Sequence, residues 1–256
     1  MNPAFKVSRR QIFSLPNSII YYIAKNPSSP KYGWKTCSGK SCSSRNSAKK
    51  IIFNKVDFKI WITDTVRIEP PKQTDNNIIS SIISKIHRCE VKSFNIQNAE
   101  IYFDQLVYLT TNAECLSIYT TTILSRNGDK ISLPNIIEFL PKIDNVFFYD
   151  ATVFIITSNT VKELIKLPQF SKIWLFQLYN IPDSFDIDTF YDYIKKKKNT
   201  HFYLKFNETI SEEYKNRLNI VIDELIKAQR GFLIPYITFP GLDEIKRKQL
   251  FERHMN

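Results

Sequence analysis

Apolar residues recur along most of the chain as pairs separated by one residue, with a longer stretch between one pair and the next. Side chains alternate across a β-strand, so each pair predicts a short strand with both members on one face. The pairs lie about 22 to 35 residues apart, which is irregular but within the range of repeat proteins. They are Phe94 and Ile96, Leu116 and Ile118, Val146 and Phe148, Ile173 and Leu175, Phe202 and Leu204, and Ile237 and Phe239, with Phe58 and Ile60 as an earlier candidate.

Between these pairs the apolar residues recur at helical spacing, most clearly after Ser211, a residue typical of helix starts. The predicted helices are 104–111, 133–140, 159–167, 188–198 and 211–227. Alternating strands and helices predict an α/β fold. The paired positions match the fourth and sixth places of the leucine-rich-repeat pattern, and Asn207 stands at its asparagine place.

We therefore expect residues 51–256 to form an irregular leucine-rich-repeat-like solenoid of alternating strands and helices. The alternative is an ordinary α/β domain with a parallel sheet, because strand-helix alternation alone implies βαβ units. A doubly wound nucleotide-binding fold would need a glycine-rich first turn, and the whole chain has five glycines.

Composition divides the chain into two parts. At 43% hydrophobic and 14% aromatic, its 256 residues can bury a sizeable core. The net charge of +11 is concentrated at one end, since residues 1–60 hold 12 Lys and Arg against the single acid Asp57. The remainder carries equal numbers of acidic and basic residues, so residues 1–50 are a basic N-terminal segment and the bulk of the chain is neutral.

A short amphipathic helix is predicted within this N-terminal segment, where apolar residues follow a proline. Its residues are Leu15, Pro16, Ile19, Ile20 and Ile23. Together with residues 26–31 and the repeat region, it resembles the F-box proteins of the nematode-expanded type with leucine-rich-repeat-like C-terminal regions. The resemblance implies that these five residues bind the Skp-type linker of a cullin-based ubiquitin ligase, and that the repeats bind a target protein. Residues 32–45 depart from the family, because they are polar and basic where an F-box continues with apolar helices.

Large aromatic residues occupy the strand positions between and after the buried pairs. If the pairs face the core, these neighbours face away from it and lie side by side on adjacent strands. They are Tyr119, Phe147, Tyr149, Trp174, Phe176 and Tyr203, with Trp61 as a further candidate. Exposed aromatic clusters are typical of interaction sites, so we expect this face to bind the partner. The alternative is a sheet covered on both faces, which would make the aromatics part of the core.

Other chemistry finds little support in the sequence. Residues 39–41 read Gly-Lys-Ser, but the first glycine of a phosphate-binding loop is replaced by Trp34. The four cysteines are Cys37, Cys42, Cys89 and Cys115, and their spacing favours free thiols over a zinc site. The run 195–198 of four lysines is typical of a solvated helix end. We predict no catalytic residue, no metal site and no cofactor.

The leading functional hypothesis is thus a non-enzymatic substrate adaptor of a cullin-based ubiquitin ligase. The alternatives are a nucleic-acid-binding repeat protein that uses the basic N-terminal arm, and a repeat scaffold with a vestigial F-box. The sequence shows neither the apolar core of a signal peptide nor an apolar run of membrane-spanning length. We therefore expect a cytoplasmic or nuclear protein.

Overall fold

The computed structural model describes residues 19–23, 49–50, 60–69, 76–229 and 231–255. Its strands are β1 (Ile19–Ile23), β2 (Lys49–Lys50), β3 (Ile60–Glu69), β4 (Ile86–Gln97), β5 (Glu100–Tyr102), β6 (Cys115–Tyr119), β7 (Thr122–Leu124), β8 (Asn145–Phe148), β9 (Leu175–Ile181), β10 (His201–Phe206) and β11 (Tyr236–Thr238). Its helices are α1 (Asn76–Ile83), α2 (Phe103–Thr110), α3 (Leu133–Glu138), α4 (Thr160–Leu164), α5 (Ile187–Lys196), α6 (Glu212–Lys227) and α7 (Glu244–Met255), with 3-10 turns η2 (Ala151–Val153) and η3 (Phe170–Lys172).

A mostly parallel sheet runs through the molecule. Within the described residues its strand order is β11-β10-β9-β8-β6-β4-β3-β1-β2. Strands β3, β4, β6, β8, β9, β10 and β11 are all parallel and stand beside one another in chain order. Strands β1 and β2 are added antiparallel at the β3 end. The α/β class expected from the sequence is confirmed, and the sheet is open and not a closed barrel.

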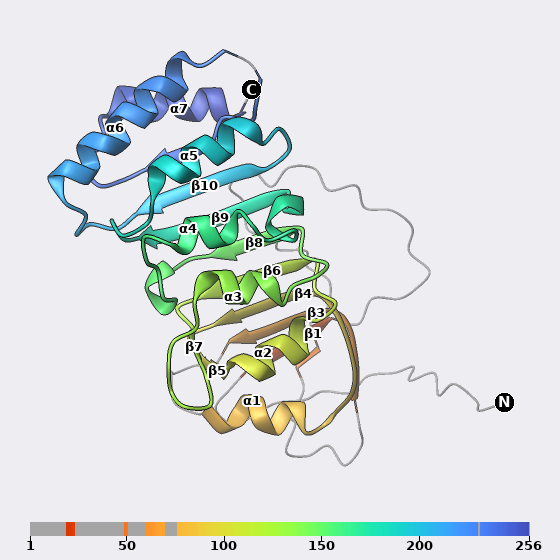
Figure 1. Ribbon diagram of the computed structural model, residues 1–256. Coiled ribbons are helices and arrows are strands. Elements are labelled where there is room, and N and C mark those ends of the chain that lie inside the picture. The colour runs from red at the N-terminus through yellow and green to blue at the C-terminus, as the bar shows by residue number, and fades with distance from the viewer. Residues whose placement is uncertain (1–18, 24–48, 51–59, 70–75, 230, 256) are drawn as a thin grey trace.

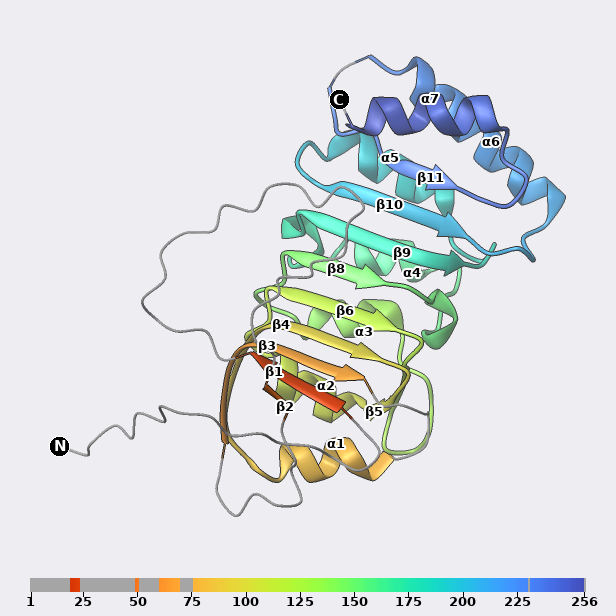
Figure 2. The ribbon, with the colours of Figure 1, turned by 180° about the vertical axis from the view of Figure 1, so that it is seen from behind.

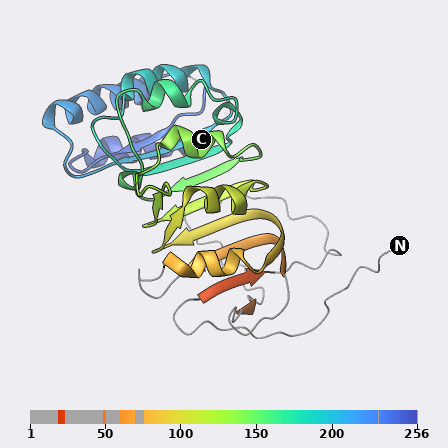
Figure 3. The same ribbon diagram turned by 60° about the horizontal axis from the view of Figure 1, so that its bottom comes forward.

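Helices α1 to α6 lie in one layer along one face of this sheet, each in the connection that leads to the next strand (Figure 1). Figure 2, seen from behind, shows the opposite face of strands β3 to β9 with no helix in front of it. The view in Figure 3 shows the helical layer along one side of the sheet and β1 at the near end. Repeated connections of this kind therefore place successive units side by side.

The core lies between the sheet and the helical layer. Side chains of neighbouring strands meet there in register, with Phe94 beside Leu116, Leu116 beside Val146, and Val146 beside Phe176. All four are fully buried. The predicted pairs that begin at Phe94, Leu116, Val146 and Phe202 occupy these inward positions, as expected from strand alternation.

Backbone turns at the strand ends repeat as well. The residues Asn98, Thr120 and Asn180 each take a positive φ, of 50°, 40° and 60° respectively. Asn98 and Thr120 directly follow β4 and β6, and β5 and β7 pair in parallel just beyond them. Left-handed backbone turns the chain sharply without glycine here, and asparagine tolerates this conformation better than most residues.

The predicted helices are found close to their expected bounds, with α2 to α6 in the five predicted places. The start of α6 is fixed by Ser211, whose side chain accepts a hydrogen bond from the amide of Tyr214 at 3.3 Å. Asp186 caps α5 in the same way through Thr189, at 3.0 Å. Side chains that satisfy the first free amides of a helix thus set these boundaries.

One of the predicted strand pairs is wrong in register. The buried pair of β9 is Phe176 and Leu178, and not Ile173 and Leu175, because β9 begins only at Leu175. The predicted pair Ile237 and Phe239 is buried as expected, with Ile237 of β11 beside Leu204 of β10.

The predicted helix at residues 15–23 is also wrong where the structure describes it. Ile19–Ile23 form strand β1, which pairs antiparallel with β3. Isoleucine and tyrosine are enriched in strands, and this segment contains no other residue type. Leu15 and Pro16 lie outside the described residues.

The C-terminal helix α7 was not predicted. Leu250 is buried, and Arg253 donates hydrogen bonds to the carbonyls of Ile226 and Ala228 at the end of α6. Lys246 forms an ion pair with Asp223 of α6, at 2.7 Å. The helix is thereby attached to the last unit of the sheet.

Candidate protein interface

Alternate residues of each strand point away from the helical layer and form the open face of the sheet. From Ser93 of β4 onward, the described positions of this face are Ser93, Asn95, Gln97, Cys115, Ser117, Tyr119, Asn145, Phe147, Tyr149, Leu175, Gln177, Tyr179, His201, Tyr203, Lys205, Tyr236 and Thr238. Lys205 is the one residue at these positions that has a formally charged side chain. The open face is therefore a surface of amides, hydroxyls and aromatic rings.

Three tyrosines form a ladder across this face. Tyr119, Tyr149 and Tyr179 take equivalent places at the ends of β6, β8 and β9. The ring centroids of Tyr119 and Tyr149 are 4.9 Å apart, and those of Tyr149 and Tyr179 are 5.4 Å apart. Edge-to-face and tilted packing at these distances stabilises the ladder and holds the rings in place. Tyr119 is 45% exposed, so the ladder is open to solvent at this end.

Most of the predicted interface residues lie on this surface. Tyr119, Phe147, Tyr149 and Tyr203 belong to the open face. Trp174 is 41% exposed but stands in the turn before β9, where its ring packs on His201 with centroids 5.0 Å apart.

The prediction for Phe176 is wrong, because this side chain has no exposed area. Because of the same register error, the prediction omitted Tyr179, which takes the outward place that Phe176 was expected to fill. The sequence does contain a signal for this register. Polar Gln177 stands between Phe176 and Leu178, which places these two on the buried face and Tyr179 on the opposite one.

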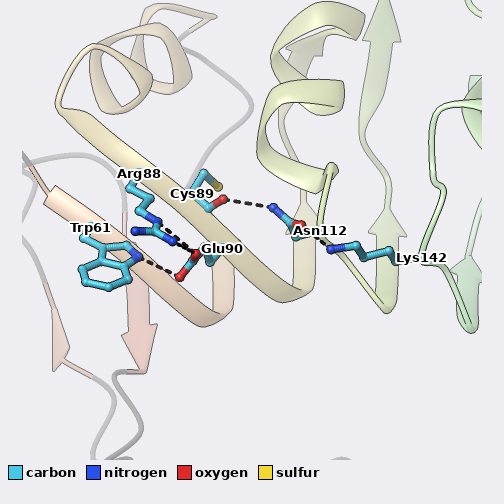
Figure 4. Close-up of polar contacts among 6 residues, drawn as sticks. All are labelled: Trp61, Arg88, Cys89, Glu90, Asn112 and Lys142. Carbon is cyan, nitrogen blue, oxygen red and sulfur yellow. Dashed lines mark hydrogen bonds and ion pairs between the residues drawn. The ribbon is translucent and has the colours of Figure 1, made fainter.

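Another exposed aromatic side chain lies at the β3 end of the sheet. Trp61 is 52% exposed, and its indole N–H donates to Glu90 Oε2 at 3.1 Å (Figure 4). The guanidinium of Arg88 lies 4.7 Å from the centre of the indole ring and donates to Glu90 Oε1 at 2.9 Å. The tryptophan is held on one face by a cation and at its edge by a carboxylate. Tryptophan and arginine are both typical of binding hot spots.

Helix α7 closes the other end of the open face with a cluster of imidazole and phenol rings. His254 is 7% exposed, and its ring lies 4.3 Å from that of Tyr203 and 5.9 Å from that of His201. Its Nδ1 is 2.6 Å from the carbonyl oxygen of Ile234. Burial lowers the pKa of both histidines, and burial also raises the pKa of Tyr203. Both imidazoles are therefore neutral at pH 7.

The predicted linker-binding residues are only partly described. Ile19, Ile20 and Ile23 lie in β1, with Ile20 opposite Ile68 and Ile23 opposite Thr65 of β3. Strand β1 lies beyond β3, as the second strand from the β2 end of the sheet.

No metal-binding arrangement is found among the described residues. No group of three or more His, Cys, Asp or Glu side chains is placed to hold a metal ion there. Cys89 is a free thiol, and burial raises its pKa. The shallow pocket between α1 and α2 contains Asp104 and Arg126, which pair with each other at 2.6 Å. Within the part of the chain that is described, no helix has the length and apolar character needed to cross a membrane.

Comparison of the chain with protein-family models, with curated proteins and with solved structures finds no match.

Proposed function

We propose that the chain is a non-enzymatic, protein-binding solenoid of leucine-rich-repeat type, and that its open face binds the partner. The repeated unit of strand, turn and helix supports this architecture, since successive units stand side by side in chain order. The observation that carries the proposal is the tyrosine ladder, which lies on the part of the open face from Ser93 to Thr238 where Lys205 is the one formally charged residue.

The chemistry of the open face fits a polypeptide partner. Tyrosine, serine and asparagine also predominate in antibody binding sites, where tyrosine gives a large contact area at a low cost in conformational entropy. Amide side chains such as Asn95, Asn145 and Gln177 can donate and accept hydrogen bonds with a peptide backbone. The packing of Tyr149 between Tyr119 and Tyr179 fixes the ladder before binding, which reduces the entropy lost on association.

A peptide library displayed on phage and selected on the immobilised chain tests this proposal. We expect the selected peptides to lose at least about tenfold in affinity when Tyr119 and Tyr149 are both changed to Ala, because truncation of hot-spot aromatics costs about 2 kcal/mol or more. The control is Ile220→Ala, since Ile220 is 49% exposed on α6 in the helical layer. Peptides that bind the double variant as well as the parent chain, or that also lose affinity for Ile220→Ala, would contradict binding at the open face.

Within this proposal the partner is a protein to be ubiquitylated, and residues 15–23 bind a Skp-type linker. The support is the resemblance of Leu15, Pro16, Ile19, Ile20 and Ile23 to the F-box opening. Because Ile19–Ile23 pair with β3, binding through a helix would require this segment to leave the sheet. The proposed role is that of a cytoplasmic or nuclear protein.

A pull-down of a purified Skp-type linker with the full chain tests the adaptor role. We expect the parent chain to retain the linker and the variant with Ile19→Asp and Ile23→Asp to lose it. The control is Ile245→Asp on α7, where the side chain is exposed. If the parent chain does not retain the linker, the F-box-like segment is vestigial, and the protein is a repeat scaffold that binds through its open face alone.

A further inference from the structure

Three lysines take equivalent places in three successive units. Strands β8, β9 and β10 begin in register, and a lysine stands three residues before the first residue of each. These are Lys142, Lys172 and Lys198. The turns that carry them are stacked, since the amide of Trp174 donates to the carbonyl of Asp144 at 2.9 Å. The three lysines therefore follow the edge of the sheet at which its strands begin.

Two further lysines extend this row. Lys196 ends α5 and Lys197 caps it, and together with Lys142, Lys172 and Lys198 they form the lysine edge. Lys197 Nζ donates to the carbonyl of Ser171 at 2.8 Å, which places it against the neighbouring turn. Lys142 Nζ donates to Asn112 Oδ1 at 2.7 Å (Figure 4). Both contacts are with neutral oxygens, so these charges are held in place without being neutralised.

None of the five lysines forms an ion pair with a carboxylate of the described residues. Cations elsewhere in this part of the chain are commonly paired, as Lys92 is with Glu114, Arg217 with Asp188 and Arg247 with Glu244. Lys195 itself pairs with Asp192 at 2.8 Å. The one carboxylate in the stacked turns is Asp144, which accepts from the side-chain amide of Asn145 at 2.8 Å.

Helix termination explains only part of this row. Cations in the last turn of a helix complement its dipole, and this accounts for Lys195 and Lys196 at the end of α5. Lys198 stands beyond the helix, and Lys142 lies four residues past the end of α3. Lys172 ends the 3-10 turn η3, so helix termination accounts for at most one of the three repeated lysines.

We propose that the lysine edge binds an acidic segment of the polypeptide partner, whose carboxylates take the place of the missing counter-charges. This inference rests on the proposed function, because the edge adjoins the open face through Trp174, which packs on His201. A partner can thus contact the open face and the lysine edge together. The short row fits a few carboxylates. Between Ser93 and Thr238 the open face has one lysine, Lys205, so among these positions no row of cations continues for a nucleic-acid backbone.

Fluorescence anisotropy with a labelled decaglutamate peptide and the full chain tests this inference. We expect the variant with Lys142→Gln, Lys172→Gln and Lys198→Gln to bind the peptide about tenfold more weakly, with binding that weakens as salt is added. The matched control changes Lys130, Lys227 and Lys248 to Gln, because these exposed lysines lie outside the edge and the net charge is equal. This control also corrects for binding to the basic residues of the N-terminal segment, which both variants retain.

Equal losses in the two variants would overturn the inference, because net charge alone would then explain binding. A single-stranded oligothymidylate of equal charge serves as the competing probe, and tighter binding of this probe that is lost in the edge variant would identify a nucleic-acid site instead. The variant with Tyr119→Ala and Tyr149→Ala should bind decaglutamate as the parent does. Failure of the open-face proposal and failure of the lysine edge are therefore distinguishable.

Discussion

Replacement of Phe176 with alanine is expected to reduce the free energy of unfolding by about 3–5 kcal/mol. The side chain is fully buried between the sheet and the helical layer, where its ring lies 5.2 Å from that of Phe170 and 6.3 Å from those of Phe148 and Phe202. Truncation removes buried apolar area and leaves a cavity that these neighbouring rings cannot fill without leaving their own rotamers. Urea unfolding followed by far-ultraviolet circular dichroism measures the loss.

Trp174→Ala is the matched control, since this larger ring is 41% exposed two residues earlier. We expect it to change the free energy of unfolding by less than about 1 kcal/mol. The reverse order, with Trp174→Ala the more damaging, would mean that the register predicted from the sequence is correct and that β9 is displaced.

Acidification below pH ~6.5 is expected to destabilise the fold through His254. Burial lowers the pKa of this group in the folded chain, so the unfolded chain binds its proton at a higher pH. Stability is therefore complete above the unfolded pKa of about 6.5 and is lost as the pH falls toward the folded value, with a slope of at most about 1.4 kcal/mol per pH unit for one histidine. Burial also lowers the pKa of His201, which contributes in the same direction but less, because it is less deeply buried than His254.

The measurement is a series of urea unfolding curves between pH 7.5 and about pH 5. The variant His254→Gln keeps a donor for the carbonyl of Ile234 but cannot titrate, so we expect a smaller dependence on pH than in the parent. His87→Gln is the control, since His87 is exposed on β4. Stability that increases on acidification, or a pH dependence that is unchanged in His254→Gln, would show that α7 is not held by a neutral imidazole.

Strand positions were predictable where a polar residue separates two apolar ones. Asn95 stands between Phe94 and Ile96, and Ser117 stands between Leu116 and Ile118, so only one face of each strand can be buried. The segment Ile173-Trp174-Leu175-Phe176 contains no polar residue, and its register is instead fixed by the hydrogen bonds of the preceding turn. Where both faces of a strand are apolar, the alternation of residue types does not show which face is buried.

The prediction of a helix within the N-terminal segment was wrong for a related reason. The spacing of Ile19, Ile20 and Ile23 satisfies a helical pattern, but Tyr21 and Tyr22 make the whole segment equally suitable for a buried strand. Its partner β3 begins at Ile60, so the choice depends on a contact that is distant in the sequence. Local pattern carries no information on such a contact.

More residues of the open face than of the lysine edge could be predicted from the sequence. Tyr119, Phe147, Tyr149 and Tyr203 follow from alternation within their own strands, and this requires no knowledge of neighbouring units. Lys142, Lys172 and Lys198 lie in turns, and their alignment depends on the register between β8, β9 and β10. Residues in loops of different length become neighbours only when the strands that follow them are aligned.

The two ends of the sheet differ from its middle, and this constrains how the chain can vary in evolution. At one end β1 and β2 run antiparallel, and at the other α7 is attached to the last unit. A unit gained by gene duplication would fit between β4 and β10, where each strand has a parallel neighbour on both sides, but not outside these specialised ends. Each inserted unit would widen the open face by about 4.8 Å, the spacing of neighbouring strands. The size of the partner's footprint can thus change in steps of one strand while both ends of the molecule stay as they are.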